Sequence, residues 1–288
     1  MRFSVFTAST PQWTPPQAAQ TLAAQGWEGI EWRITDQAEA AEPGFWAGNL
    51  ATWPLTGLEE HLAEIARITH GAGLQFSGLG GYTRADDRSN VERMLAATAA
   101  LGAGRVRVTM PALGEGHYRD LLARTRDDLA WAAQRASEHG VTVLVELHHR
   151  TIVASASAAM RLVDGLDPAR VGVIHDIGNL VIEGHEDPLA AFQMLGPYLA
   201  HVHVKNVAWR PAGTTPGGTV VWAQDWAPLW EGQADLDAYL HALIAHGYDG
   251  WVTVEDFSTT QPLAERTRAN LAYLRSLHQA TSPQATST

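Results

Sequence analysis

Four short apolar segments in the second half of the chain each carry, at or near their C-terminal ends, a residue type that binds metal ions. They are 141–146 with Glu146, 171–176 with Asp176, 201–205 with His203, and 251–255 with Glu255. Each segment is rich in β-branched residues and bounded by turn or helix signals, as buried strands are. The gaps between them are long enough for a helix, and strands joined by helices run parallel. The segments therefore predict a parallel sheet with four polar side chains gathered at one rim.

The same alternation of strand and helix runs through the whole chain. Further strands are expected at 3–7, 29–33, 74–79 and 105–109, and helices at 15–25, 58–70, 90–101, 118–138, 157–165, 188–195, 236–246 and 262–277. Eight such pairs in 288 residues are typical of a single-domain (β/α)8 TIM barrel, which commonly takes about 250 residues. We expect the barrel to span residues 1–278, and the polar residues 279–288 to form a frayed tail.

Two stretches without a regular pattern interrupt this alternation. Residues 35–57 contain Trp46 and Trp53, and the longest loop, 208–235, contains Trp209, Trp222 and Trp226. A loop of this length in a compact domain is usually functional or disordered, and its tryptophan content argues against disorder. We expect the second stretch to be a lid or substrate wall, with one or two of these tryptophans stacking on a ligand.

Composition excludes several classes of function. The net charge of −11 argues against nucleic acids and anionic membranes as partners, because binding them needs a basic surface. The chain has no cysteine, which rules out disulfides and thiolate metal sites. It contains no apolar run of about 18 residues, which a membrane-spanning helix requires, and its first residues do not resemble a signal peptide. A cytoplasmic location is therefore expected.

The strand-end residues predict a metal centre. Three carboxylates and one imidazole at a single point would be costly to bury unless a cation lies between them. We therefore expect Glu146, Asp176, His203 and Glu255 to hold one divalent ion. A ligand set of oxygen and imidazole without thiolate favours Mn²⁺; it also suits Mg²⁺ and Co²⁺, and Zn²⁺ remains open.

Residues beside the ligands extend this prediction. Alternation along a strand places His201, His203 and Lys205 on one face. Lys205 is expected to hold a substrate oxygen or phosphate, or else to pair with an acid at the rim. His201 is expected to be hydrogen-bonded inside the barrel, whereas His175 should face the helices in a structural role.

Further candidates for substrate binding also have structural alternatives. His148 either faces the site or lies on the surface, and His149 is expected to be structural. Glu31 and Arg33 share one face of their strand, where they either form a buried pair or contact substrate. Arg210 opens the long loop and either reaches the ligand or is a solvated charge.

Several motifs together resemble one superfamily. The segment 171–179, followed by 196–206, is similar to the sugar isomerase/epimerase superfamily of xylose isomerase-like TIM barrels, as are 29–33, 247–251 and 254–257. In that superfamily a metal is held by Glu, Asp, His and Glu from strands five to eight, which match Glu146, Asp176, His203 and Glu255. The resemblance to ketose epimerases further implies that Glu146 and Glu255 act as acid/base groups on opposite faces of the sugar carbon.

At two positions the chain departs from the pattern of these relatives. Ketose epimerases and inosose dehydratases often have a histidine where this chain has Asn179, and epimerases carry a substrate-binding glutamate where it has Ile152. Asn179 can hydrogen-bond a substrate hydroxyl but cannot act as an acid or base. These differences argue against a typical ketose 3-epimerase and leave the four-ligand set intact.

The leading functional hypothesis is a divalent-metal-dependent isomerase or epimerase of a sugar, cyclitol or related hydroxy-ketone, working through an enediolate. The alternative is a lyase on the same scaffold, either a dehydratase of a keto-cyclitol or dehydroshikimate, or an enzyme that eliminates the aglycone of a 3-keto-glycoside. Less favoured are a phosphodiesterase related to endonuclease IV, which needs three zinc ions, and a non-catalytic sugar-binding or regulatory barrel. Related barrels are often oligomeric, so a homodimer or homotetramer is expected.

Overall fold

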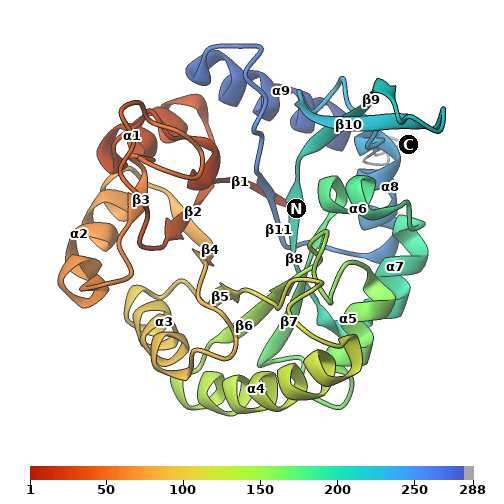
Figure 1. Ribbon diagram of the computed structural model, residues 1–288. Helices are drawn as coiled ribbons and strands as arrows, with labels where there is room; N and C mark the ends of the chain where they lie inside the picture. The colour runs from red at the N-terminus through yellow and green to blue at the C-terminus, as the bar shows by residue number, and fades with distance from the viewer. Residues whose placement is uncertain (282–288) are drawn as a thin grey trace, which may run out of the picture.

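The strands close into a barrel in the computed structural model, which describes residues 1–281 (Figure 1). The barrel strands are β1 (Arg2–Phe6), β2 (Gly29–Ile34), β4 (Gln75–Gly81), β5 (Arg105–Val108), β6 (Thr142–Glu146), β7 (Val171–Asp176), β8 (Leu199–Val204) and β11 (Trp251–Val254). Each is parallel to its neighbours, and β1 pairs with both β2 and β11, which completes the ring. The short strand β3 (Thr52–Trp53) pairs with β2 alone. The predicted (β/α)8 barrel is confirmed.

Helices surround the strands as an outer layer (Figure 1). They are α1 (Pro15–Gln25), α2 (Leu58–Gly71), α3 (Arg88–Leu101), α4 (Tyr118–His139), α5 (Ala156–Val163), α6 (Ile177–Glu183), α7 (Pro188–Leu195), α8 (Leu236–His246) and α9 (Leu263–Thr281). Side chains of Asp87, Asp187 and Asp235 accept backbone hydrogen bonds at the starts of α3, α7 and α8, and Gly140 and Gly247 end α4 and α8 in the left-handed conformation. The helix boundaries thus follow local capping signals.

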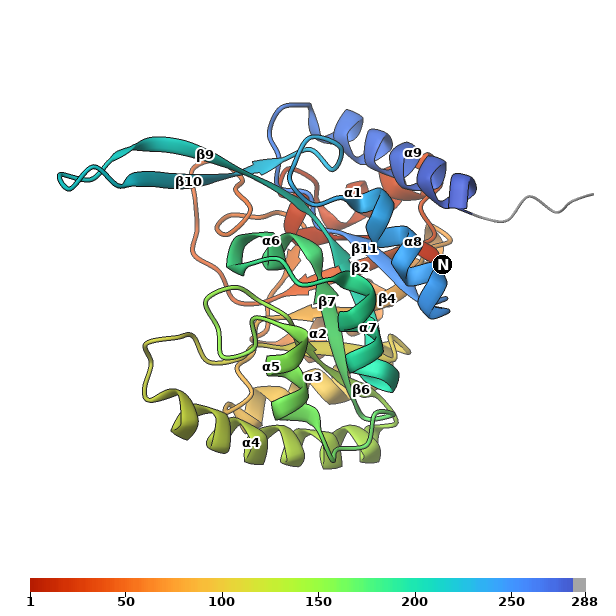
Figure 2. The same cartoon turned by 90° about the vertical axis from the view of Figure 1, so that its right-hand side faces the viewer.

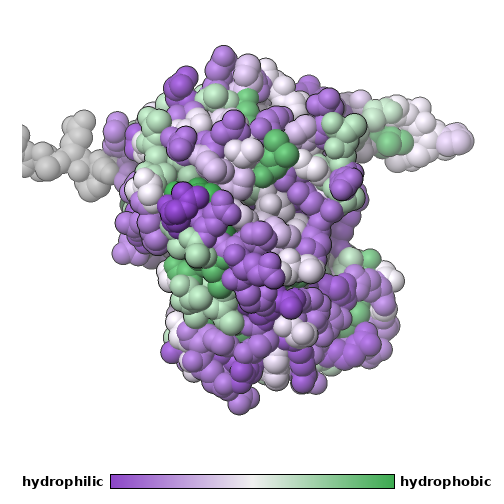
Figure 3. Space-filling view, turned by 90° about the vertical axis from the view of Figure 1, so that its left-hand side faces the viewer, coloured by the Kyte–Doolittle hydropathy of each residue, from purple (hydrophilic) through white to green (hydrophobic). Residues whose placement is uncertain are grey.

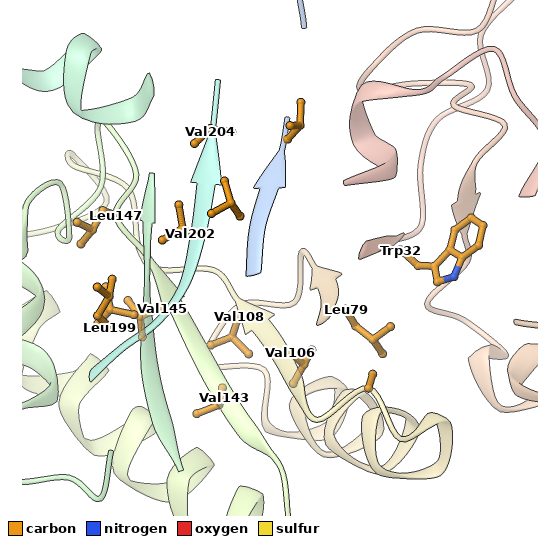
Figure 4. Packing of buried hydrophobic residues seen from close by; sticks show 14 of the residues in the cluster. Trp32, Leu79, Val106, Val108, Val143, Val145, Leu147, Leu199, Val202 and Val204 are labelled. Carbon is orange, nitrogen blue, oxygen red and sulfur yellow. The ribbon is translucent and has the colours of Figure 1, made fainter. Parts of the chain in front are cut away.

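Alternation along the strands separates an apolar outer face from a polar interior. Val106 and Val108 of β5 belong to the hydrophobic core, whereas Arg107 between them lines a cavity. Figure 4 shows the core residues of neighbouring strands, among them Val143 and Val202. Both faces of a parallel barrel strand are covered, so even its polar residues are buried. The barrel therefore places charged side chains of several strands in one low-dielectric interior.

The longest predicted loop is instead an ordered hairpin. Strands β9 (Asn206–Thr214) and β10 (Val220–Ala227) pair antiparallel, and the hairpin projects well beyond the barrel in Figure 2 and Figure 3. Its outer part exposes Val220, Val221 and Trp222, the last with 56% of its surface accessible. The hairpin thus projects from the barrel at the C-terminal end of β8. The prediction that residues 208–235 form a loop without regular structure was wrong.

Two short elements were not predicted, and one helix ends later than expected. Helix α6 follows β7 directly and was not predicted, and the irregular stretch 35–57 contains β3. Helix α9 continues to Thr281, so residues 279–281 are helical and not part of a frayed tail, while 282–288 lie outside the described residues. No helix among residues 1–281 combines the length and apolar character needed to cross a bilayer.

Candidate metal centre

The structure brings the four predicted ligands together. Glu146 ends β6, Asp176 ends β7, His203 lies near the end of β8, and Glu255 follows β11. All four are buried, and one ligand atom from each lies within 4.8 Å of the others. The register pairs Asp176 with His203 across β7 and β8. The rim of the parallel sheet therefore supplies four ligand atoms from four consecutive barrel strands.

Glu31 orients the histidine of this group. Nε2 of His203 lies 3.0 Å from Oε2 of Glu31, and Nε2 of His201 lies 2.9 Å from the same oxygen. Nδ1 of His203 is buried without a hydrogen-bond partner among residues 1–281, and it lies 3.8 Å from Oε1 of Glu146. Burial lowers the pKa of His203, but Glu31 and Glu146 outweigh this effect and raise the pKa to about 10. A metal ion that binds Nδ1 must therefore displace a proton.

Asp176 is oriented by the helix that follows it. Its Oδ1 accepts a hydrogen bond from the backbone N–H of Asn179 at 3.0 Å, which caps α6. This leaves Oδ2, which lies 2.8 Å from Nζ of Lys205. Gly178 makes that approach feasible, because a Cβ there would lie 2.3 Å from Cγ of Lys205. Burial raises the pKa of Asp176 to about 7, an effect that Lys205 opposes and that Glu146 and Glu255 reinforce.

The charges of this group leave room for a divalent cation once His203 and Asp176 have lost their protons. Nζ of Lys205 contacts Glu255 and lies 3.9 Å from Oε1 of Glu146, while Nη1 of Arg107 lies 2.6 Å from Oε2 of Glu146. The carboxylates of this interior are Glu31, Glu146, Asp176 and Glu255. With His203 neutral, as a metal-bound imidazole must be, and all four carboxylates ionised, the two permanent cations Arg107 and Lys205 leave an excess of two negative charges; without a metal, protonation of His203 and Asp176 offsets most of it. A single divalent ion beside neutral His203 cancels this excess, so the residues present fit such an ion in charge and in donor type.

A cavity of about 370 Å³ opens onto this group. Trp46, Tyr82, Trp226 and Phe257 form its aromatic walls, and Glu146 and Glu255 are among its lining residues. Of the predicted substrate-binding residues, His148, Asn179 and Lys205 line it. Its size is in the range of small-molecule sites, so the arrangement can hold a compact ligand against the four candidate metal ligands.

The other predicted substrate-binding residues do not line the cavity. Glu31 lies deeper in the barrel on His201 and His203. Arg33 does not pair with it, because its Nη1 donates to Gln37 and Thr52 at 2.9 and 2.8 Å. Arg210 lies on the exposed hairpin, 3.5 Å from Asp225. These three positions therefore give no direct support to a substrate contact.

Of the five tryptophans singled out in the two irregular stretches, two line the cavity and three do not. Trp46 and Trp226 line the cavity, in keeping with the expectation that one or two would lie near a ligand. Trp53 is packed in the core, Trp209 donates to the carbonyl of Val181 at 3.1 Å, and Trp222 is exposed on the hairpin. Only the base of the hairpin therefore contributes to the wall that the sequence suggested for this segment.

Sequence reasoning missed several cavity residues, among them Arg107, Tyr82 and His149. The guanidinium of Arg107 lies 4.5 Å from the ring centre of Tyr82, and its Nη2 is buried without a hydrogen-bond partner among the described residues. An arginine between two valines of a barrel strand was a usable signal for this position. The placement of Tyr82 in a loop gave no such signal, and His149 was expected to be structural.

Comparisons with known proteins agree with this architecture. The sequence model of a family described as a xylose isomerase-like TIM barrel matches residues 20–277. An inosose dehydratase from Lacticaseibacillus casei is 30% identical over 154 residues, which cover 47% of this chain and 47% of that protein. The match thus spans about half the length of that relative.

Solved structures resemble the chain over almost its full length. A 3-keto-D-glucoside 4-epimerase from E. coli is 19% identical, with a TM-score of 0.71 over 96% of this chain and 99% of that one. A xylose isomerase-like TIM barrel protein from Mycobacterium smegmatis, solved in complex with magnesium, is 16% identical, with a TM-score of 0.71 over 98% of both chains. At these identities the likeness shows the fold alone.

Proposed function

Because the chain belongs to the family of xylose isomerase-like TIM barrels, we propose that it is a divalent-metal-dependent isomerase or epimerase of a sugar, cyclitol or related hydroxy-ketone. A fold does not define a reaction, so the proposal depends on the site. The observation that carries it is the set of four buried ligand atoms within 4.8 Å of one another, two of whose residues line a cavity. The substrate would be a small sugar or keto-sugar.

Glu146, Asp176, His203 and Glu255 would hold the metal, and their donor types favour Mn²⁺ while suiting Mg²⁺, Co²⁺ and Zn²⁺ as well. When bound, such an ion polarises a substrate carbonyl as a Lewis acid. Glu31 supports this role by fixing the ring of His203, and the cap on α6 does so by fixing Asp176. These neighbours restrict the ligand side chains before any ion arrives.

Proton transfer at the carbon next to that carbonyl is assigned to Glu146 and Glu255. Burial raises the pKa of Glu146, but Arg107, His203 and Lys205 hold it well below its usual value. Glu146 is therefore ionised at neutral pH and able to accept a proton. In an isomerase or epimerase, one carboxylate removes the proton and the enediolate of the substrate is reprotonated at another position or on another face.

Other cavity residues would bind and shield the substrate. Nη2 of Arg107 is a buried donor without a partner among residues 1–281, and it can donate to a substrate oxygen in place of water. Nζ of Lys205 is a second donor beside the carboxylates. Trp226 and Phe257, with ring centres 5.2 Å apart, form an apolar wall that excludes water from the reacting atoms.

A lyase is the second candidate, favoured by the similarity to an inosose dehydratase. It would begin with the same removal of a proton by a carboxylate. The electron pair of the broken C–H bond would then expel a hydroxyl from the next carbon, and that hydroxyl would leave as water after taking up a proton. A keto-cyclitol dehydratase or an enzyme that eliminates the aglycone of a 3-keto-glycoside would share this first step.

Metal content is the first test. Wild-type protein should bind about one divalent ion per chain, and Glu146→Gln, Asp176→Asn, His203→Ala and Glu255→Gln should each weaken binding strongly. Glu60→Gln, an exposed residue of α2, is the matched control. Protein that binds none of Mn²⁺, Mg²⁺, Co²⁺ and Zn²⁺ would refute the proposal, and three ions per chain would favour the phosphodiesterase.

The reaction class is tested with metal-loaded protein in D2O. Ketohexoses, inososes and 3-keto-glucosides are incubated separately and followed by NMR. An isomerase or epimerase should yield an isomer of the substrate in which deuterium replaces one hydrogen next to the carbonyl, whereas a lyase should yield a product that has lost water or the aglycone. Neither exchange nor product from any member of the panel would count against both reactions.

A further inference from the structure

The amide of Asn179 has a fixed orientation. Its Nδ2 donates to Oε1 of Glu146 at 3.2 Å and to the backbone carbonyl of Leu147 at 3.1 Å. A carboxylate that is ionised and a backbone carbonyl can only accept hydrogen bonds, so the group that faces both of them must be the NH2 group. The opposite end of the amide is therefore the acceptor Oδ1. Asn179 is 1% exposed, so solvent does not compete for these bonds.

That orientation determines which nitrogen of His149 carries a proton. Nδ1 of His149 lies 2.8 Å from Oδ1 of Asn179, and an oxygen that can only accept requires a donor opposite it. His149 is therefore protonated on Nδ1. Burial and the neighbouring His148 lower the pKa of His149, in agreement with a ring that is neutral at pH 7. In the neutral ring the other nitrogen, Nε2, carries a lone pair.

Nε2 has no hydrogen-bond partner within the described chain, and His149 lines the cavity. We propose that His149 presents unprotonated Nε2 to the cavity as a hydrogen-bond acceptor for a hydroxyl group of the substrate, with Asn179 as the positioning residue that holds this tautomer. This inference rests on the proposed function for its hydroxylated substrate. It gives Asn179 a role beyond a direct contact with substrate, and it gives His149 a role that the sequence did not suggest.

Such an acceptor would act on specificity. Arg107 and Lys205 supply only donors to the cavity, and the amide donors of Asn179 are already engaged. Glu146 and Glu255 also line the cavity as acceptors, but they are assigned to the metal and to proton transfer, so His149 would add an acceptor that is free to recognise the hydrogen of a substrate hydroxyl. A site built in this way rejects an analogue that lacks the hydroxyl, because its buried polar group is then left unpaired.

His148 provides an internal control. Its Nδ1 lies 2.9 Å from the backbone carbonyl of His149, and the two rings stack with centres 4.4 Å apart. His148 is therefore also protonated on Nδ1, but its partner is a backbone atom that no side-chain substitution removes. A change at Asn179 should alter the tautomer of His149 and leave that of His148 unaltered.

The test is a two-bond ¹H–¹⁵N correlation spectrum of the imidazoles in ¹⁵N-histidine-labelled protein loaded with diamagnetic Mg²⁺. His149→Phe and His148→Phe identify the two signals among the 13 histidines. Wild type should show the proton of His149 on Nδ1. Asn179→Leu, which removes the acceptor, should move the proton to Nε2, and Asn179→Gln, which keeps an amide with one donor end and one acceptor end, should retain it on Nδ1. A wild-type His149 with its proton on Nε2, or a tautomer insensitive to Asn179→Leu, would overturn the inference.

Kinetics test the contact with substrate. On the substrate that wild type converts, His149→Phe and Asn179→Leu should raise KM about tenfold with a smaller change in kcat, and Asn179→Gln should recover most of the loss. Metal content is measured for every variant. A metal-loaded His149→Phe enzyme with unchanged KM would refute the hydroxyl contact. Wild-type protein that binds no metal would instead refute the proposed function, and with it the substrate role of His149.

Discussion

Nε2 of His203 lies 3.0 Å from Oε2 of Glu31, and the side chains are 0% and 2% exposed. This contact turns Nδ1, the nitrogen without a partner among residues 1–281, toward Glu146. A carboxylate that accepts a hydrogen bond from the nitrogen of a histidine that does not bind the metal fixes the imidazole ring and increases the basicity of the other nitrogen. Glu31 is therefore best understood as a positioning residue for the candidate metal site. Its place outside the cavity supports that role over a contact with substrate.

Substitution of Glu31 should weaken metal binding although Glu31 is not itself one of the four predicted ligands. Glu31→Gln keeps the shape of the side chain and removes its charge, so the dissociation constant for Mn²⁺ should rise about 10- to 100-fold. Isothermal titration calorimetry measures this, with Glu60→Gln as the exposed control and circular dichroism as a check on folding. An unchanged dissociation constant in a folded Glu31→Gln protein would contradict the assigned role.

Removal of the metal should lower thermal stability. A ligand that binds only the folded state at 100 times its dissociation constant stabilises that state by about 2.7 kcal/mol, which corresponds to about 5 °C or more in Tm for a chain of this size. Dialysis against EDTA should produce this drop in wild type, and added Mn²⁺ should reverse it. Asp176→Asn should show little response to either treatment. Equal Tm values of chelated and Mn²⁺-saturated wild type would argue against the site.

Much of the barrel follows from local sequence signals. The strands are short apolar runs between helices with clear stops, and tertiary contacts then close them into a ring. The hairpin was missed because Pro211, Gly213 and Pro216 interrupt any alternating pattern, and because its outer apolar residues are exposed and mark no buried face. Helix α6 was missed because it begins immediately after Asp176, without an intervening loop to separate it from the strand.

The candidate site was predictable where chemistry coincides with a strand end. Glu146, Asp176 and Glu255 could be placed at one rim because parallel strands share a direction. Pairing inside the barrel was harder to predict, since Glu31 bonds to residues of β8 and not to Arg33 on its own strand. Residues such as Tyr82 come from loops whose paths depend on contacts distant in sequence, so no local pattern places them.

Acid should weaken an ion-pair cluster between α3 and α4. Hydrogen bonds from Arg135 and His139 lower the pKa of Glu92 from 4.5 to about 2, against the opposing effect of burial. A lowered folded-state pKa stabilises the fold above about pH 4.5, and this contribution is lost as the pH falls toward 2. Because the cluster is one-third exposed, its contribution is at most about 1 kcal/mol.

Urea unfolding of wild type and Glu92→Gln at pH 7 and pH 3 measures this contribution. Wild type should be the more stable protein at pH 7, and the difference should shrink at pH 3 and at high salt. Glu60→Gln controls for the loss of one exposed carboxylate. A difference that is as large at pH 3 as at pH 7 would show that Glu92 stabilises the protein in some way other than by its charge.

The two aromatic residues of β10 should differ in their effect on substrate binding. Trp226 lines the cavity beside Phe257, whereas Trp222 is exposed on the outer hairpin. Trp226→Ala removes an apolar contact and should raise KM about tenfold. Trp222→Ala should leave KM and kcat close to wild type. A comparable loss in Trp222→Ala would mean that the hairpin folds over the cavity during the reaction, and steady-state kinetics on the converted substrate distinguishes the two cases.

Lys205 should oppose metal binding and stabilise the protein when no metal is bound. It is the only lysine of the chain, and its Nζ lies 2.8 Å from Oδ2 of Asp176 and contacts Glu255. Two unit charges about 4 Å apart interact by about 4 kcal/mol at an effective dielectric constant of 20. Lys205→Met should therefore bind Mn²⁺ at least about tenfold more tightly. It should also have a lower Tm in EDTA, because its carboxylates lose a buried counter-charge.

Calorimetry and thermal unfolding, each with and without metal, test both effects of Lys205. Lys205→Arg keeps the charge and is the matched control, so its metal affinity should not increase. In ¹³C-lysine-labelled wild type the single side-chain signal should shift when Mg²⁺ is added, since the ion and the ammonium group share the same carboxylates. Weaker or unchanged Mn²⁺ binding in Lys205→Met would show that the ammonium group does not compete with the ion. The charge excess of this interior would then need a different account.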